Sequence, residues 1–373
     1  MFVSKVAASF GPVYILSEIL EGFGSEQFGE LSNKLILIGV IVYLVQYSFS
    51  LRQTKQLINN ELSISTILSK GISLKAFLAF FGCLFFILLA DTTSPYSMML
   101  SSVLLAESMH PRWYLLGLRR FSWIAIYQVV LNILMLLIYY LFREINIHIL
   151  YSLIFGLTPI TLNALLLIKI FREYKISFSR RNIFADLIDG MPYFIIQITP
   201  VLYTYGYIII YGFFNNGHDS GRMYMELKYL TAVIGIYSVM TSVSYTFVHD
   251  ILYKNVKKLL WITAFLLFLI LLLCSDMFWD FLTSGLYGIL SFRHKLMFAI
   301  IPILFSARTI YGLNGLIIRN KTKIYLLIAI ISSCVACFVS IIIGASDLII
   351  PLFIGHFCYA LLSVVFSKLE VES

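Results

Sequence analysis

The chain has 373 residues, of which 60% are hydrophobic and only 12% are charged. An ordinary soluble domain is about 45–50% apolar and about 25% charged, so this composition excludes a water-soluble protein. A membrane helix needs about 20 apolar residues, so a dozen of them would occupy roughly 240 residues and leave no room for a sizeable soluble catalytic domain or a nucleic-acid module. The formal net charge of +8 is therefore assigned to the loops of a membrane protein.

Hydropathy predicts membrane spans along the whole chain, six on each side of the polar segment 171–189. The spans of the first half are 2–22, 31–51, 74–91, 96–110, 121–141 and 148–170, and those of the second half are 190–213, 228–249, 259–276, 296–318, 324–345 and 348–367. We expect an all-α polytopic membrane protein with about 12 transmembrane helices in two six-helix lobes, residues 1–186 and residues 187–373.

Lysine and arginine residues in the predicted loops set the orientation. With the N-terminus in the cytoplasm, the cytoplasmic side carries 20 of them, including Lys70 and Lys75, and the other side carries six. Loops rich in these residues stay inside, so we expect both termini in the cytoplasm. The first apolar run begins almost at Met1 without a separate cleavage site, so we expect it to remain as an anchor.

Four predicted spans carry polar residues at steps of three and four, which places each set along one helix face. Hydrocarbon offers no hydrogen bonds, so such a face must turn toward protein or toward a water-filled cavity. Helix packing through small residues explains any single stripe. Stripes on the first two helices of both halves favour a central cleft between the lobes. The stripes are Ser4, Gly11, Tyr14, Glu18 and Glu21; Tyr43, Tyr47 and Ser50; Tyr193, Gln197, Pro200, Thr204, Tyr207 and Tyr211; and Lys228, Thr231, Gly235, Ser238, Ser242, Tyr245 and His249.

Charged residues inside the spans narrow the candidates further. Arg308 lies near the middle of the tenth span, where an arginine costs at least about 2.5 kcal/mol on insertion scales. It pairs either with a substrate or with a carboxylate in a structural salt bridge. Glu18 lies one turn from the end of the first span, so it is either interfacial or functional, and Glu107 is a weaker candidate near a span end. His356 is expected to be a packed neutral histidine.

Enzyme chemistry has little support in the sequence. There is no HExxH, P-loop or GxSxG motif and no metal-ligand cluster with usable spacing. The predicted outer loops are all short, whereas a membrane polymerase would usually carry catalytic groups on an extended one. We expect a protein that is not an enzyme and that uses no cofactor and no metal.

Four short motifs, in chain order, resemble those of one family. Residues 24–31 (GSEQFGEL) resemble a "G-x-E-x-F-G" turn after the first helix, and residues 110–117 (HPRWYLLG) resemble an "N-P-x-W-x-x-x-G" turn before the fifth span. Met191-Pro-Tyr-Phe with the later tyrosines resembles its seventh helix, and Tyr224-Met-Glu-Leu-Lys228 resembles the start of its eighth. The family is that of the O-antigen (Wzx-type) polysaccharide flippases, within the multidrug/oligosaccharidyl-lipid/polysaccharide exporter superfamily.

This resemblance implies a twelve-helix, two-lobed fold in which helices 1, 2, 7 and 8 line the cavity. It also implies a function: a flippase that moves an undecaprenyl-diphosphate-linked oligosaccharide, such as an O-antigen unit, across the bacterial inner membrane by alternating access. The implied partners are that lipid-linked oligosaccharide, membrane lipid, and the polysaccharide polymerase and chain-length machinery, with no nucleic acid. The alternatives are a membrane oligosaccharide polymerase and an exporter of drugs or small cations from the same superfamily.

Candidate roles follow from the charge of the substrate. An anionic diphosphate in a low-dielectric cleft needs fixed cations, and Arg308 and Lys228 are the candidates. Tyrosines can stack on sugar rings and donate hydrogen bonds to hydroxyl groups, although ordinary packing explains them equally well. The cleft candidates are Arg308, Lys228, Glu18, Tyr193, Gln197, Thr204, Tyr207, Tyr211, Tyr43 and Tyr47, and Arg112, Arg119 and Arg120 form either a loading patch at the cytoplasmic mouth or a topology signal.

Overall fold

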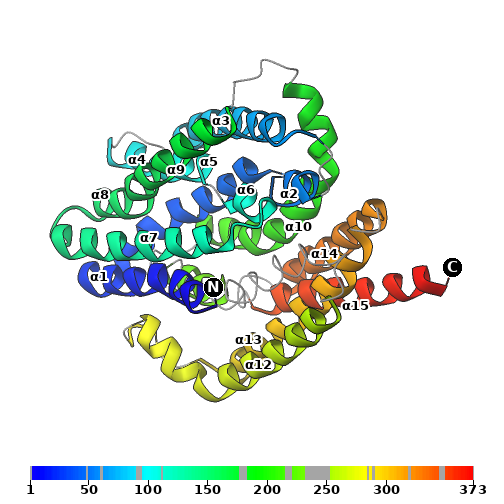
Figure 1. Ribbon diagram of the computed structural model, residues 1–373. Coiled ribbons are helices and arrows are strands. Elements are labelled where there is room, and N and C mark those ends of the chain that lie inside the picture. The colour runs from blue at the N-terminus through cyan, green and yellow to red at the C-terminus, as the bar shows by residue number, and fades with distance from the viewer. Residues whose placement is uncertain are drawn as a thin grey trace.

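A computed structural model describes most of the chain, and its described residues are helical apart from short connections (Figure 1). The described ranges are 2–47, 49–58, 62–89, 95–110, 112–175, 183–214, 221–231, 253–283, 285–287, 290–317, 321–343 and 349–372. Within 2–10 and 202–214 only the backbone is described. No strand occurs in these ranges, which agrees with the expected all-α fold.

The first half of the chain forms helices that correspond to the first six predicted spans. They are α1 (Phe2–Gln46), the π-helix η1 (Phe49–Gln53), α2 (Thr54–Ile58), α3 (Ile64–Leu89), α4 (Pro95–Leu100), α5 (Ser102–Ser108), α6 (Arg112–Gly117), α7 (Phe121–Phe142), α8 (Ile147–Ser152), the π-helix η2 (Leu153–Leu157) and α9 (Thr158–Tyr174). The fourth predicted span is divided between the short helices α4 and α5.

The second half begins with a long helix and ends with a hairpin of two. Its elements are α10 (Ile183–Phe214), a helical stretch over 221–231, α12 (Tyr253–Thr283), α13 (Phe292–Ala307), the π-helix η3 (Arg308–Ile317), α14 (Thr322–Ile343) and α15 (Ile349–Glu372). The tenth predicted span therefore changes its winding at Arg308. Most of the eighth predicted span, residues 232–249, lies outside the described residues.

Eight helices within the described ranges are long and apolar enough to cross a membrane. The first of them, Gly11–Gln46, contains two predicted spans as two helical arms that meet in a kink at Gly24. Gly24 has φ 79° and ψ 166°, a backbone conformation that an L-residue with a side chain rarely adopts. A glycine there lets the chain leave one helical arm and start the next with almost no loop, as the "G-x-E-x-F-G" resemblance predicts.

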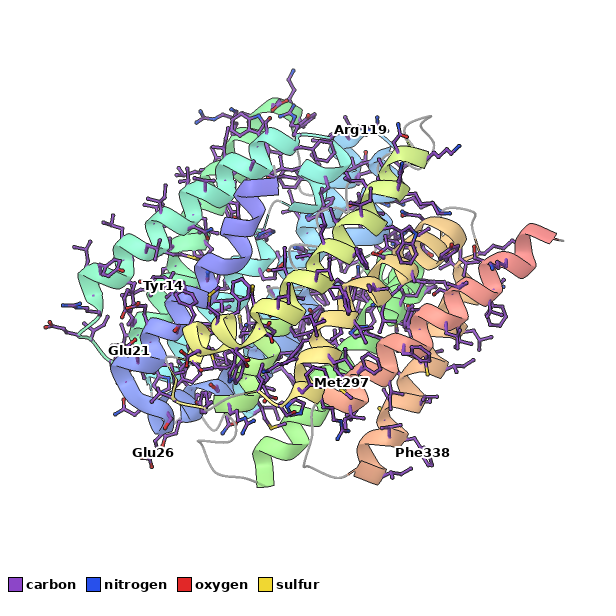
Figure 2. The ribbon with its side chains drawn as sticks, turned by 90° about the horizontal axis from the view of Figure 1, so that it is seen from below. Tyr14, Glu21, Glu26, Arg119, Met297 and Phe338 are labelled. Carbon is purple, nitrogen blue, oxygen red and sulfur yellow. The ribbon has the colours of Figure 1, made fainter. Side chains whose placement is uncertain are left out.

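The outer surface of the bundle is apolar where a lipid chain would meet it. In α3 and α12, which lie at opposite edges of the molecule (Figure 1), Leu88 is 79% exposed and Leu273 is 81% exposed. Long apolar side chains at that exposure would be unstable in water but are at home in hydrocarbon. Charged side chains occupy the two ends instead: Glu21 and Glu26 lie at one end of the bundle and Arg119 at the other (Figure 2). The chain is a multi-pass membrane protein.

The third membrane helix corrects one prediction. The sequence predicts a third span that starts at residue 74 and counts Lys70 and Lys75 with the cytoplasmic side. However, α3 begins at Ile64, so Lys75 lies eleven residues inside the helix, about 16 Å along its axis. Hydropathy averages over a window, and two lysines lower the average enough to shift the predicted start. The helical spacing of Ile64, Ile67, Leu68 and Leu74 continues through this region and was the signal for the earlier start.

The two arms of α1 lie at the centre of the packing. α1 contacts α3 and α7 of the first half and also α10 and α12 of the second half. Its buried side chains join a core that continues into the helical stretch 221–231 and into α12 and α13. The two halves of the chain are thus joined through one continuous apolar core, with α1 and α10 between them. The division into lobes 1–186 and 187–373 stays a prediction, and α10 starts slightly before that boundary.

Candidate functional site

Arg308 lies at the junction between α13 and η3, surrounded by aromatic rings. Its guanidinium carbon is 4.2 Å from the centroid of the Tyr359 ring and 5.4 Å from that of Phe305. Its Nε lies 3.4 Å from the hydroxyl of Tyr325. The three rings come from α13, α14 and α15, so three helices fix the position of one cation. Aromatic faces stabilise a desolvated guanidinium without neutralising its charge.

A close approach of backbone to side chain holds this frame together. A Cβ atom added to Gly312, in η3, would lie 2.3 Å from the Tyr325 ring and 2.8 Å from the Ser363 hydroxyl. Only glycine leaves enough room for η3 to pack so closely against α14 and α15. π-Helical segments of this kind occur frequently at functional sites. The winding change at Arg308 therefore belongs to the construction of the site.

Tyr43 connects Arg308 with the first half of the chain. It is close enough to interact electrostatically with both Arg308 and Glu107. On the other side of Arg308, His356 is also within electrostatic range of the guanidinium, and its ring centroid lies 4.9 Å from that of Phe305. Two predicted site residues, Tyr43 and Arg308, thus lie within electrostatic range of each other although they come from opposite halves.

Lys75 and Glu107 extend this arrangement, and the sequence analysis did not assign them a common role. The Lys75 Nζ lies 3.1 Å from the Glu107 carbonyl oxygen and 3.8 Å from its carboxylate Oε1. The Lys75 side chain is only 4% exposed, and that of Glu107 is 20% exposed. A buried lysine beside a partly exposed glutamate is unusual within a membrane span and marks a functional site by default. We call Tyr43, Lys75, Glu107, Arg308 and His356 the central polar cluster.

Lys228, the second predicted cation, lies elsewhere, in the helical stretch 221–231. Its Nζ is 4.8 Å from the centroid of the Tyr224 ring, and its carbonyl accepts a hydrogen bond from Thr231 at 3.0 Å. Tyr224 in turn packs against Phe28 of α1, with ring centroids 6.1 Å apart. Lys228 is half-buried beside a contact between the two halves. The remaining residues of its stripe, Gly235, Ser238, Ser242, Tyr245 and His249, lie outside the described residues.

Glu18 faces another helix of its own half. Its Oε2 lies 3.4 Å from the Tyr139 hydroxyl in α7, and one turn earlier Tyr14 and Tyr140 pair through their hydroxyls at 3.1 Å. The carboxylate thus takes part in a group of tyrosines between α1 and α7. The structure does not bring it to the central polar cluster.

The predicted tyrosines and glutamine divide into those in contact with other helices and those whose side chains are not described. Tyr47 donates a hydrogen bond to the Leu187 carbonyl and stacks on Phe194 at 4.7 Å, which joins α1 to α10. Tyr193 packs beside the apolar cluster that contains Tyr325. Gln197 is half-buried in α10. Thr204, Tyr207 and Tyr211 lie on the helical backbone of α10, but their side chains lie outside the described residues.

The proposed loading patch is divided as well. Arg120 forms a two-pronged contact with the Glu173 carboxylate and donates to the Tyr174 hydroxyl at 2.9 Å. This hydrogen bonding to Glu173 raises the pKa of Arg120 further, so the cation is permanent. Arg119 is exposed, with φ 54°. The Arg112 side chain lies outside the described residues. Arg120 thus has a structural partner, which agrees with a topology role as well as with loading.

Comparison with known proteins identifies the fold. No protein-family model and no curated protein matches the sequence. Among solved structures, this chain is similar to the eukaryotic MATE transporter AtDTX14. The alignment covers 100% of this chain and 94% of the AtDTX14 chain, at 11% identity and a TM-score of 0.64. A variant of the Vibrio cholerae MATE transporter VcmN covers 100% of this chain with 95% of its own, at 13% identity and a TM-score of 0.66.

A multidrug resistance MATE family transporter of the MOP superfamily gives similar values in two states. Its inward-facing conformation covers 100% of this chain with 98% of its own, at 9% identity and a TM-score of 0.63. At these identities the likeness establishes the fold alone. The chain has the fold of MATE transporters, so the expected all-α membrane fold is confirmed, and the neighbours are not enzymes. Eight helices within the described ranges are long and apolar enough to cross a membrane, so the count of about 12 stays a prediction, and the substrate is a separate question.

Proposed function

We propose that this chain is a flippase that moves an undecaprenyl-diphosphate-linked oligosaccharide across the bacterial inner membrane, with both termini in the cytoplasm. The fold supports the general class, a transporter of the MOP superfamily. The observation that carries the finer proposal is the charge of the central polar cluster. Its members include two basic residues, Arg308 and Lys75, and one acidic residue, Glu107. A site with an excess of positive charge in a low-dielectric bundle favours an anionic substrate over a cationic one.

The surroundings of Arg308 suit a diphosphate that carries sugars. A guanidinium presents a planar fork of donors that matches two phosphate oxygens at once. The flanking Tyr325 and Tyr359 rings suit the apolar face and the hydroxyls of a sugar. In this proposal Arg308 binds the diphosphate, Tyr43 contacts it from the first half of the chain, and the polyprenyl tail stays in the lipid. Lys228, beside the other contact between the halves, serves as a second cation for the anion during its passage.

The principal alternative is an exporter of drugs or small cations. The structural neighbours include a multidrug resistance MATE family transporter, and an aromatic frame also accepts a cationic ligand. In that case Glu107 would be the binding group and Arg308 would oppose the substrate. A polymerase has less support, because the neighbours are transporters.

Reconstitution in proteoliposomes separates these functions. A fluorescent undecaprenyl-diphosphate-linked oligosaccharide is placed in both leaflets, and dithionite quenching reports how much of it reaches the outer leaflet with time. The flippase proposal predicts complete quenching with the protein and half quenching without it. Efflux of ethidium from the same vesicles without lipid flipping would establish the alternative instead.

A further inference from the structure

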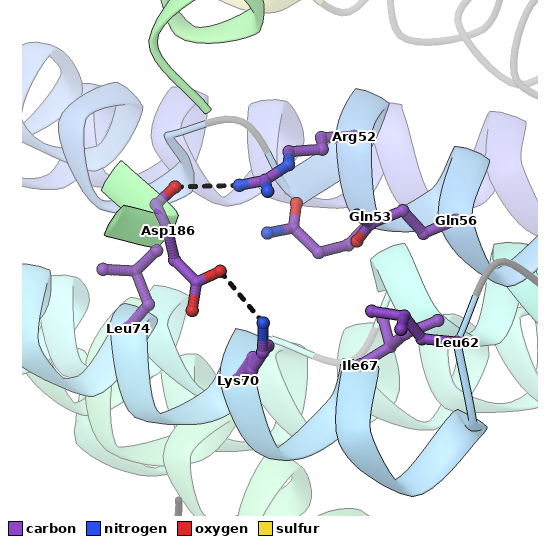
Figure 3. Close-up of a pocket in the computed structure, with 8 residues that line it drawn as sticks. All are labelled: Arg52, Gln53, Gln56, Leu62, Ile67, Lys70, Leu74 and Asp186. Carbon is purple, nitrogen blue, oxygen red and sulfur yellow. Dashed lines mark hydrogen bonds and ion pairs between the residues drawn. The ribbon is translucent and has the colours of Figure 1, made fainter. Parts of the chain in front are cut away.

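A narrow pocket opens at the end of the bundle that is predicted to be cytoplasmic, where η1, α2 and α3 meet the start of α10 (Figure 3). Its polar wall consists of Arg52, Gln53, Gln56, Lys70 and Asp186, and three aliphatic side chains form the rest. Neither the fold nor the sequence motifs assign a role to this pocket. It shares no residue with the central polar cluster.

The cations of the pocket are joined to α10 by long contacts. The Lys70 Nζ lies 3.3 Å from the Asp186 Oδ1, and the Arg52 Nη2 lies 3.3 Å from the Asp189 Oδ2. Arg52 also donates to the Asp186 carbonyl at 2.8 Å. Well-formed contacts between a cation and a carboxylate measure about 2.7–2.9 Å, and the Asp189 side chain is 67% exposed and therefore screened by solvent. Each carboxylate holds its cation by a single loose contact that a stronger anion can replace.

Gln53 supplies the second observation. It is 5% exposed, and its Oε1 has no hydrogen-bond partner among the residues that the structure describes. Figure 3 shows its amide between Arg52 and Lys70, on the side of the pocket that faces Asp186. A buried amide oxygen needs a donor. A ligand that satisfies this pocket therefore carries anionic oxygens for the two cations and a hydroxyl or amide N–H for Gln53.

We propose that this pocket binds the glycosyl diphosphate headgroup of the substrate before it reaches the central polar cluster. This inference rests on the proposed function. The diphosphate takes the place of the Asp186 and Asp189 carboxylates on Lys70 and Arg52, and the first sugar donates to Gln53. Since both aspartates belong to α10 and both cations to the first half, binding of the headgroup removes the ion pairs that join these parts of the chain. The loading step and the release of α10 become one event.

The proposal predicts opposite effects for the two members of one ion pair. Lys70→Gln removes a cation that binds the headgroup, so the affinity falls about tenfold, the loss of one charge-assisted contact. Asp186→Asn removes the competing carboxylate, so the affinity rises by a similar factor. Gln53→Met keeps the size of the side chain but removes the acceptor, so it weakens binding of a glycosyl diphosphate while leaving binding of pyrophosphate unchanged. Lys254→Gln, at an exposed lysine of α12, is the matched control and changes nothing.

The experiment uses the full chain in lipid nanodiscs and isothermal titration calorimetry. The probes are UDP-N-acetylglucosamine, a water-soluble glycosyl diphosphate in which uridine replaces the lipid, together with inorganic pyrophosphate, inorganic phosphate and uridine. The expected order of affinity is the glycosyl diphosphate, then pyrophosphate, then phosphate, with no binding of uridine. Equal affinity for phosphate and for the glycosyl diphosphate would assign the pocket to free phosphate and overturn the proposal.

Two further outcomes overturn it. If Lys70→Gln and Asp186→Asn change the affinity in the same direction, the pair is only structural. If no probe binds to well-folded protein at millimolar concentration, the pocket is not a headgroup site. If Lys70→Gln fails to fold, two other variants still test the proposal. Lys70→Arg keeps the charge and must retain binding, and Asp186→Asn must raise the affinity for the glycosyl diphosphate. If the protein flips the lipid but binds no probe, the pocket proposal fails and the proposed function stands. If it binds the probe but does not flip the lipid, the pocket stands as a binding site and the proposed function fails.

Discussion

Replacement of Arg308 tests the central polar cluster most directly. The guanidinium lies 4.2 Å from the Tyr359 centroid and 3.4 Å from the Tyr325 hydroxyl, so its position is fixed before any substrate arrives. A hydrogen bond to a charged group contributes about 1.5–3 kcal/mol. Arg308→Ala removes the proposed contact with the substrate diphosphate. At 1.4 kcal/mol for each factor of ten, we expect the flipping rate to fall by about 10- to 150-fold. Arg308→Lys keeps the charge but loses the fork, so it retains an intermediate rate.

The assay is the initial rate of dithionite-sensitive flipping in proteoliposomes, normalised to the amount of inserted protein. Arg143→Ala, at the exposed C-terminal end of α7, controls for the loss of an arginine as such and keeps the full rate. Thermal unfolding distinguishes a substrate-binding arginine from a structural one, because removal of a structural arginine would lower the unfolding temperature. Flipping at the full rate by a well-folded Arg308→Ala variant would refute the role of the cluster in binding the diphosphate.

Three other outcomes follow from the packing. Gly312→Ala places a methyl group 2.3 Å from the Tyr325 ring and should lower the stability by about 1–3 kcal/mol, the usual result of overpacking, measured by thermal unfolding in detergent. Lys75→Met leaves the partly exposed Glu107 carboxylate beside an apolar side chain and should destabilise the protein by about 1–3 kcal/mol, less than the loss for a fully buried pair, and adding Glu107→Gln should recover much of that loss. In a cysteine-free background, Glu26→Cys should react with an impermeant maleimide from outside the cell and Arg119→Cys only after lysis.

Each of these has a clear contrary result. Gly22→Ala is the control for the glycine, since a Cβ at Gly22 meets nothing within 4 Å, and equal losses at both positions would contradict the packing argument. A double Lys75/Glu107 variant less stable than Lys75→Met would mean that the two residues do not act as a pair. Labelling of Arg119→Cys from outside would reverse the predicted orientation.

Hydropathy and charge were sufficient for the membrane class and for most helices, because these depend on composition over windows of about 20 residues. The turn at Gly24 was also predictable, since the sequence motif requires a glycine there. The predicted start of the third helix at residue 74 was wrong by ten residues, because Lys70 and Lys75 lower the average of a hydropathy window, whereas apolar neighbours and Glu107 keep Lys75 inside the bundle.

The site itself was only partly accessible from the sequence. The sequence singled out Arg308 and Tyr43 because a charge or a polar stripe inside a span stands out from its surroundings, and their role in binding stays a prediction. The partners of Glu18 were not predicted, because the face that a helix presents to its neighbour depends on the rotation of both helices. η3 adds a further obstacle: π-helical hydrogen bonds run from i to i+5, so spacing rules based on 3.6 residues per turn lose their register beyond Arg308.

The interruption of α1 at Gly24 also constrains how the protein enters the membrane. Forty-five residues of helix would extend about 68 Å, roughly twice the hydrocarbon thickness, and almost no connecting loop separates the two arms. With the N-terminus in the cytoplasm, the two arms have too short a connection to be inserted one after the other. They must therefore enter the membrane together as a helical hairpin. The tip of that hairpin carries Glu21 and Glu26, and transfer of these carboxylates through the bilayer is the costly moment of biogenesis. The tightness of this turn, which serves packing in the finished protein, thus fixes the order of its assembly.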